Sequence, residues 1–133
     1  MHPQANVHGD PLEVCSLDPV TGFYRDGYCT TGPDDLGSHT VCTVVTAEFL
    51  EHQRLIGNDL VTPMPQYGFA GLQPGDRWAV CASRWQESYA AGVKAPVVLR
   101  ATNAAALDAV SLDALLECAA DAPDDPSALL DGS

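Results

Sequence analysis

Short apolar runs bounded by turn residues predict three β-strands. Residues 39–45 are rich in β-branched side chains at consecutive positions, which is typical of a strand buried on both faces. Residues 77–82 follow a Pro-Gly-Asp turn, and residues 97–102 follow Pro96. We expect these three strands to form one sheet.

Apolar residues at helical spacing predict helices between and after the strands. Over residues 47–56, Phe49 and Ile56 lie on one face, Thr46 suits the amino-terminal cap and Gly57 suits the carboxyl-terminal cap. Three more short helices are predicted over residues 83–91, 104–109 and 111–120. The last of these has the most regular apolar face, formed by Leu112, Leu115, Leu116, Ala119 and Ala120.

Turn residues dominate the two remaining segments. Residues 6–40 and 58–76 are rich in Gly, Pro and Asp, which predicts long ordered loops. The pattern favours a small two-layer α+β domain, with a short sheet covered on one face by helices and long amino-terminal loops. We expect a flexible terminus over residues 1–5, a single domain over 6–120 and an acidic disordered tail over 121–133.

Length and charge limit the classes of function. A chain of 133 residues suits one domain, and its net charge of −12 disfavours binding to nucleic acid or to anionic membranes. No apolar run is long enough to span a bilayer, and the first residues lack the pattern of a signal peptide. We therefore expect a cytoplasmic protein that binds neither nucleic acid nor membranes. The oligomeric state is left open.

Five cysteines give the chain its most distinctive chemistry. In a reducing cytosol they are expected to be thiols. Cys15, Cys29, Cys42 and Cys81, together with His39, contain the ligand types that hold zinc in a tetrahedral site. The chain contains no Cys-x-x-Cys pair, however, and free cysteines commonly serve as small buried hydrophobes. Both interpretations stand at this level.

A reactive thiol is the third interpretation of the cysteines. Cys42 and His39 are candidates for a catalytic nucleophile and its base. Residues three apart in a strand point to opposite faces, so this pair requires His39 to lie in the preceding loop.

Arginine and tryptophan recur together and predict a ligand site. Only six residues are basic, yet two Arg-Trp pairs occur. Guanidinium groups bind anions by paired hydrogen bonds, and indole rings stack on planar groups. The candidate ligand-binding residues are Arg25, Asp59, Asp76, Arg77, Trp78, Arg84 and Trp85. The alternative is that Arg25 and Arg77 only hold the loops in place, by pairing with Asp26, Asp59 or Asp76.

Three functions from different classes follow. We favour a small-ligand-binding module with a loop-walled polar pocket. The alternatives are a Cys/His metal-binding or thiol-based redox or enzyme domain, and a protein-interaction domain without a pocket. Because the first loop needs anchors, we also expect Cys15, Cys29, Cys42 and Arg25 to point inward, with at least two of the three sulfurs close together near His39.

Several short motifs also resemble a known family. They occur in order along the chain and include Asp18-Pro-Val-Thr-Gly22, Arg25-Asp-Gly27, His39-Thr-Val-Cys42, Pro74-Gly-Asp-Arg-Trp78 and Arg84-Trp-Gln-Glu87. The sequence resembles the bacterial and plant proteins grouped as domain of unknown function 2237. The resemblance implies a small two-layer α+β domain and implies no activity. Many relatives read Trp-Cys-x-Cys where this chain has Trp78-Ala-Val-Cys81, so a function that needs the additional thiol does not carry over.

Overall fold

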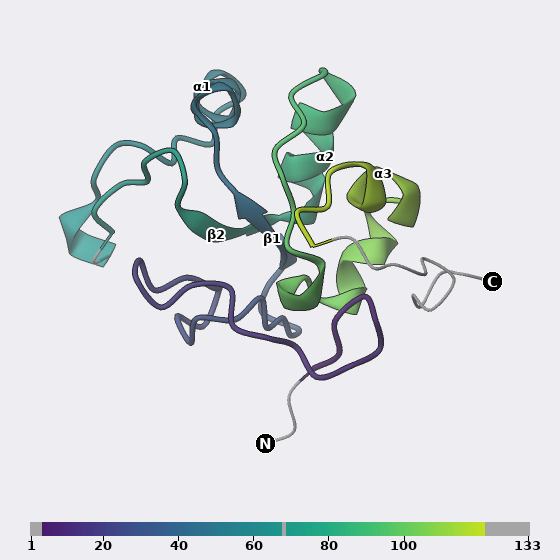
Figure 1. Ribbon diagram of the computed structural model, residues 1–133. Helices are drawn as coiled ribbons and strands as arrows, with labels where there is room; N and C mark the ends of the chain where they lie inside the picture. Colours follow the sequence, from purple (N-terminus) through teal and green to yellow (C-terminus); the bar gives the residue numbers. More distant parts are fainter. Residues whose placement is uncertain (1–3, 68, 122–133) are drawn as a thin grey trace.

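The fold is built around one pair of antiparallel strands (Figure 1). The computed structural model describes residues 4–67 and 69–121. The strands are β1 (His39–Val44) and β2 (Arg77–Cys81), and the helices are α1 (Ala47–Leu55), α2 (Ala82–Ala90) and α3 (Leu112–Glu117). Three 3-10 helices cover Pro65–Tyr67, Leu99–Ala101 and Ala104–Asp108. The predicted α+β class is confirmed.

The two strands pair in a regular register that ends in a bulge. Val41 lies opposite Val80, and the pairing continues regularly as far as Val44 and Arg77. Regular continuation in the other direction would place Thr40 opposite Cys81. Instead, the register shifts between His39 and Val41, so that His39 becomes the partner of Cys81. The bulge therefore determines which side chain faces the end of β2.

The predicted third strand over residues 97–102 is wrong. Val97 makes one isolated bridge to Thr43, and the chain then enters a 3-10 helix. The cause is a competing acceptor, because the carboxylate of Asp121 accepts hydrogen bonds from the backbone N–H groups of Leu99 and Arg100 at 2.6 and 3.1 Å. These two N–H groups are therefore not available to pair with a neighbouring strand.

Helices α1 and α3 begin where their caps predict. The Thr46 side chain accepts a hydrogen bond from the Phe49 N–H at 3.0 Å, and the Ser111 side chain accepts one from Ala114 at 3.2 Å. Helix α3 ends at Glu117, earlier than expected, because Ala119 and Ala120 turn to pair with Val97. The segment expected to be helical over 104–109 forms a 3-10 helix instead.

Two hydrophobic cores lie on opposite faces of the strand pair. Val41 and Val80 contribute to the larger core, which is filled by the helices through Phe49, Trp85 and Leu115. The smaller core consists of Leu12, Cys15, Cys29, Cys42, Ala79, Val98 and Ala101. Figure 1 shows the amino-terminal segment, in purple, on the other side of the strands from α1. Alternation along each strand thus separates a helix-covered face from a loop-covered face.

Side-chain and backbone contacts hold the long first loop in place. Gln4 exchanges two hydrogen bonds with the backbone of Thr31, at 2.6 and 2.9 Å. Asn103 donates to the carbonyl of Cys29 at 3.0 Å, and the Thr21 hydroxyl accepts from the Ala79 N–H at 2.8 Å. The loop is therefore ordered by partners that are distant in the sequence.

None of the helices in the described part of the chain is long and apolar enough to cross a membrane. The predicted acidic tail over residues 121–133 and the predicted flexible terminus over residues 1–5 fall mostly outside the described residues.

Leu115→Ala tests the larger core. The Leu115 side chain has no solvent exposure, so its truncation leaves a cavity and should lower the free energy of unfolding by about 2–5 kcal/mol. Leu36, which is 95% exposed, provides a matched control whose Leu→Ala change should cost less than about 0.5 kcal/mol. Chemical denaturation measures both variants, and equal stability of the two would contradict this packing.

Candidate functional site

A buried carboxylate anchors the loop that enters β1. The Asp35 side chain is fully buried, and its Oδ2 accepts hydrogen bonds from the His39 N–H at 2.8 Å and the Thr31 hydroxyl at 3.0 Å. Its Oδ1 lies 2.6 Å from Nδ1 of the His39 ring. A carboxylate can only accept, so Nδ1 is the donor and the ring orientation is fixed.

The other nitrogen of the same ring faces a thiol. His39 Nε2 lies 3.3 Å from Sγ of Cys81, its cross-strand partner at the bulge. Cys81 is also the residue that immediately precedes α2, and its side chain makes no capping hydrogen bond. Asp35, His39 and Cys81 therefore form a continuous chain of hydrogen bonds that ends at the amino terminus of a nine-residue helix.

This environment favours the charged form of His39. The hydrogen bond to Cys81, assisted by the carboxylate of Asp35, raises the pKa of His39 to about 9, against the opposing effect of partial burial. The ring is therefore protonated at neutral pH. The side chain keeps 32% of its surface exposed.

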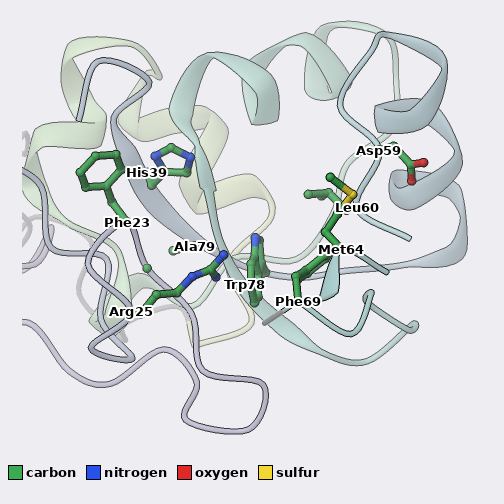
Figure 2. Close-up of a pocket in the computed structure, with 10 residues that line it drawn as sticks. Phe23, Arg25, His39, Asp59, Leu60, Met64, Phe69, Trp78 and Ala79 are labelled. Carbon is green, nitrogen blue, oxygen red and sulfur yellow. The ribbon is translucent and has the colours of Figure 1, made fainter. Parts of the chain in front are cut away.

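A cavity of about 290 Å³ lies next to His39 (Figure 2). Its walls combine aromatic and aliphatic side chains with three ionisable groups. The lining residues are Gly22, Phe23, Arg25, His39, Asp59, Leu60, Met64, Phe69, Trp78 and Ala79. The Phe23 ring lies 5.7 Å from the His39 ring between centroids, so the imidazole forms part of a mostly apolar wall.

Arg25 and Trp78 form a cation–π pair in the wall of this cavity. The guanidinium carbon lies 5.0 Å from the centre of the Trp78 ring, and Figure 2 shows the two side chains side by side. Arg25 is exposed and has a positive φ of 55°, in a turn flanked by Gly22 and Gly27 that also have positive φ. Arg25 was expected to point inward and to bond a carboxylate or loop carbonyls, and this expectation is wrong, because its side chain is exposed and makes neither contact among the described residues.

The sulfurs of the three loop cysteines come together as expected, but His39, which was expected beside them, is not part of their cluster. Cys15 and Cys42 form a disulfide, and all three sulfurs, including the buried thiol of Cys29, lie within 4.8 Å of one another. The expectation that all the cysteines are thiols is thus wrong. Burial, and secondarily the charge of Asp26, strongly raises the pKa of Cys29, which keeps it a neutral thiol.

This arrangement divides the predicted zinc ligands between two places. Cys15 and Cys42 have no free thiolate in the disulfide, and His39 is held by Asp35 and Cys81 instead of joining the sulfur cluster. The residues in this state do not fit a tetrahedral zinc site. Cys42 likewise offers no nucleophile, so the Cys42–His39 pair is corrected to Cys81–His39.

The structure also divides the predicted ligand-binding residues. Arg25, Asp59 and Trp78 line the cavity, although the carboxylate of Asp59 is engaged by the N–H groups of Val61 and Thr62. The other four lie outside its lining. Arg84 donates a hydrogen bond to the Ile56 carbonyl and contacts Glu87. Trp85 is buried in the larger core, and Arg77 is exposed at the start of β2. The carboxylate of Asp76 accepts a hydrogen bond from the Gln73 N–H.

Several site residues were not expected from the sequence. Asp35 lies in the segment 6–40 that is expected only to form a loop rich in turn residues, although its spacing of four residues from His39 suits a contact across a tight turn. Cys81 was placed among zinc ligands without its pairing to His39. The apolar walls formed by Phe23, Met64 and Phe69 carry no local signal, because single apolar residues in loops are common.

Comparison with known proteins gives one match. A family model described as "Uncharacterized protein conserved in bacteria (DUF2237)" matches residues 5–119. The match contains β1, β2, the helices α1, α2 and α3, and the residues of the site. A search of curated proteins finds no match. The resemblance noted in the sequence is confirmed.

Titration of the His39 ring tests the electrostatics of this site. NMR should give the ring a pKa of about 9, and Cys81→Ala and Asp35→Asn should each lower that pKa toward the ordinary value of 6.5. Because the folded-state pKa is raised, the stabilising effect is complete below about pH 6.5 and is lost as the pH rises through about 9. The free energy of unfolding, measured by denaturation across this pH range, should decline in the wild type. The decline should be smaller in His39→Gln, which lacks the titrating ring. If the His39 ring titrated at 6.5 in the wild type, in Cys81→Ala and in Asp35→Asn, the described contacts would be contradicted.

Proposed function

The protein belongs to the bacterial family DUF2237, and we propose that it is a small-ligand-binding protein whose cavity accepts an anion with an apolar body. The observation that carries this proposal is the guanidinium of Arg25, which is stacked on Trp78 in the wall of the cavity. Among the described residues, no carboxylate lies within ion-pair distance of Arg25. Its hydrogen-bond donors are therefore free for a ligand.

Charge supports an anionic ligand. The cavity holds two cationic side chains, Arg25 and protonated His39, in a protein whose net charge is −12. Asp59, the acidic residue in its wall, already accepts three hydrogen bonds within its own turn. A local positive centre in an acidic protein concentrates anions at one place and disfavours them elsewhere.

The walls support an apolar body on the ligand. Five of the ten residues that line the cavity have large apolar or aromatic side chains, namely Phe23, Leu60, Met64, Phe69 and Trp78. The volume of the cavity is at the lower end of the range for small-molecule sites, which is about 300–1,000 Å³. A small aromatic or branched carboxylate has this combination of charge and shape. A built cavity of this kind also weakens the alternative of an interaction domain without a pocket.

The strained turn at Arg25 supports a recognition role. A positive φ is uncommon for a residue with a side chain and costs of order 1 kcal/mol. Gly22 cannot be replaced without conflict, because a Cβ there would lie 2.3 Å from the carbonyl oxygen of Tyr28. The turn therefore presents Arg25 to the cavity at a cost in stability.

Benzoate and its neutral analogue benzamide test the proposal. Both fit an aromatic pocket, and only benzoate gains a charge-assisted interaction with Arg25. We expect benzoate to bind more tightly in an NMR titration, with shifts at Trp78 and Phe69. Arg25→Met keeps an unbranched apolar stem over Trp78 and should weaken benzoate binding roughly ten- to a hundredfold, equivalent to about 1.5–3 kcal/mol.

The matched control is Arg100→Met, because Arg100 is also exposed but lies outside the cavity lining. This change should leave benzoate affinity unaltered. An equal loss in both variants would mean that only net charge matters. Equal binding of benzoate and benzamide to the wild type would contradict an anion site at Arg25.

A further inference from the structure

We propose that Cys81, His39 and Asp35 form a nucleophilic thiol site beside the cavity, able to transfer an acyl group from a small ester or thioester. This activity goes beyond ligand binding. Cys81 is the nucleophile, His39 is the general acid and base, and Asp35 is a positioning residue that holds the imidazole. The proposal stands on geometry: one nitrogen of the ring faces a buried carboxylate at 2.6 Å and the other faces a thiol at 3.3 Å.

The contacts of the two ring nitrogens determine which of them can accept the proton of the Cys81 thiol. Nδ1 donates to Asp35, so a neutral ring would present Nε2 as an acceptor toward the thiol. When the proton moves from sulfur to Nε2, the result is a thiolate beside an imidazolium. The thiolate is the reactive form of cysteine. The raised pKa of His39 agrees with an imidazolium held between two acceptors.

The loop that carries Asp35 and His39 does not need the contact between the imidazole and the thiol for its anchoring. The loop that enters β1 is already fixed by backbone groups, since Ser38 donates to the Asp35 carbonyl at 3.1 Å and Ala82 donates to the Ser38 carbonyl at 3.0 Å. The His39 N–H adds a bond to the Asp35 side chain. The contact between the ring and the thiol is not needed for that anchoring.

The surroundings leave the sulfur room to react. Cys81 is partly exposed, and Gly37 lies against it so closely that a Cβ there would be 2.9 Å from Sγ. The absence of a side chain at Gly37 therefore keeps the space beside the sulfur open. The amino terminus of α2 begins at the next residue, and the partial positive charge of a helix amino terminus favours an anionic sulfur and a developing oxyanion.

Comparison with the other cysteines makes Cys81 distinct. Cys15 and Cys42 are joined in a disulfide, and Cys29 is fully buried. Cys118 is partly exposed on the surface, where burial raises its pKa and the nearby Glu117 raises it further. In the described part of the chain, Cys81 is the one free thiol that is hydrogen-bonded to an imidazole.

The reaction balances with water as the only co-reactant. The Cys81 sulfur forms a bond to the acyl carbon, the bond from that carbon to the leaving group breaks, and the leaving group takes the proton from His39 Nε2. Water then adds to the thioester and gives a proton to His39, and the bond between sulfur and carbon breaks. The products are a carboxylic acid and the protonated leaving group, and the thiolate–imidazolium pair is restored.

Alkylation with iodoacetamide tests the reactivity of the thiol directly. The native protein is labelled at pH 7 without a reductant, so that the disulfide stays intact, and the modified residues are assigned by peptide mass spectrometry. We expect Cys81 to react roughly a hundredfold faster than Cys118, and His39→Gln to remove most of that advantage. Cys118→Ser should leave the rate at Cys81 unchanged.

The acyl-transfer step is tested with p-nitrophenyl acetate as the probe. Wild-type protein should release p-nitrophenolate and carry an acetyl group on Cys81, and both signals should be absent in Cys81→Ser. Asp35→Asn should slow acetylation of Cys81 and should move the alkaline limb of the pH–rate profile of acetylation to lower pH, in parallel with the lowered pKa of His39. A merely structural contact would change the pKa of His39 without moving this profile. Melting curves verify that each variant is folded, and His39→Gln provides a second, partly exposed position if Asp35→Asn is unstable.

Two outcomes overturn the proposal. One is equal alkylation of Cys81 and Cys118 in the folded wild type. The other is the absence of acetylation at Cys81 when p-nitrophenyl acetate is in excess. Neither depends on benzoate binding, so a failure of the thiol site is distinguishable from a failure of the anion pocket.

Discussion

The bulge at the start of β1 is the feature on which the site depends. A regular ladder would bring Thr40 opposite Cys81, and the register shift brings His39 there instead. Bulges re-aim side chains next to functional sites, and here the effect is to place an imidazole nitrogen 3.3 Å from a sulfur. Asp35 supports the shift from the other side, because the same carboxylate holds both the backbone N–H and the ring of His39.

The two faces of the strand pair are covered by different parts of the chain. Helices cover one face through Phe49, Trp85 and Leu115, which are fully buried. The amino-terminal loop covers the other face, where a disulfide joins Cys15 to Cys42. This cross-link joins two cysteines that are 27 positions apart in the sequence, and it limits the freedom of the segment that carries part of the cavity wall. Order in the loop thus comes from long-range contacts, since its local sequence favours only turns.

Local sequence pattern predicted the elements whose partners are local. The strands at 39–45 and 77–82 and the helix at 47–56 were found because alternation, caps and turn residues lie within each segment. The predicted third strand was wrong because Asp121, about twenty residues away, accepts hydrogen bonds from the N–H groups of Leu99 and Arg100.

The site was predicted only in part, because most of its contacts join residues that are distant in the sequence. Two Arg-Trp pairs look alike in sequence, and both tryptophans pack in the larger core, yet only Trp78 also lines the cavity. The disulfide, the bulge and the pairing of His39 with Cys81 depend on tertiary contacts that spacing alone does not determine.

The thiol of Cys81 is held by His39 beside a cavity whose wall carries the cationic groups of Arg25 and His39. This arrangement is tested most directly by the ratio of alkylation rates with iodoacetate, an anion, and iodoacetamide, its neutral analogue, at Cys81 of the wild-type protein. The reference is the same ratio for N-acetylcysteine in free solution. Arg25 and protonated His39 should attract the anionic reagent, so the ratio at Cys81 should exceed the reference and should fall in Arg25→Met. A ratio at or below the reference in the folded wild type would contradict this arrangement.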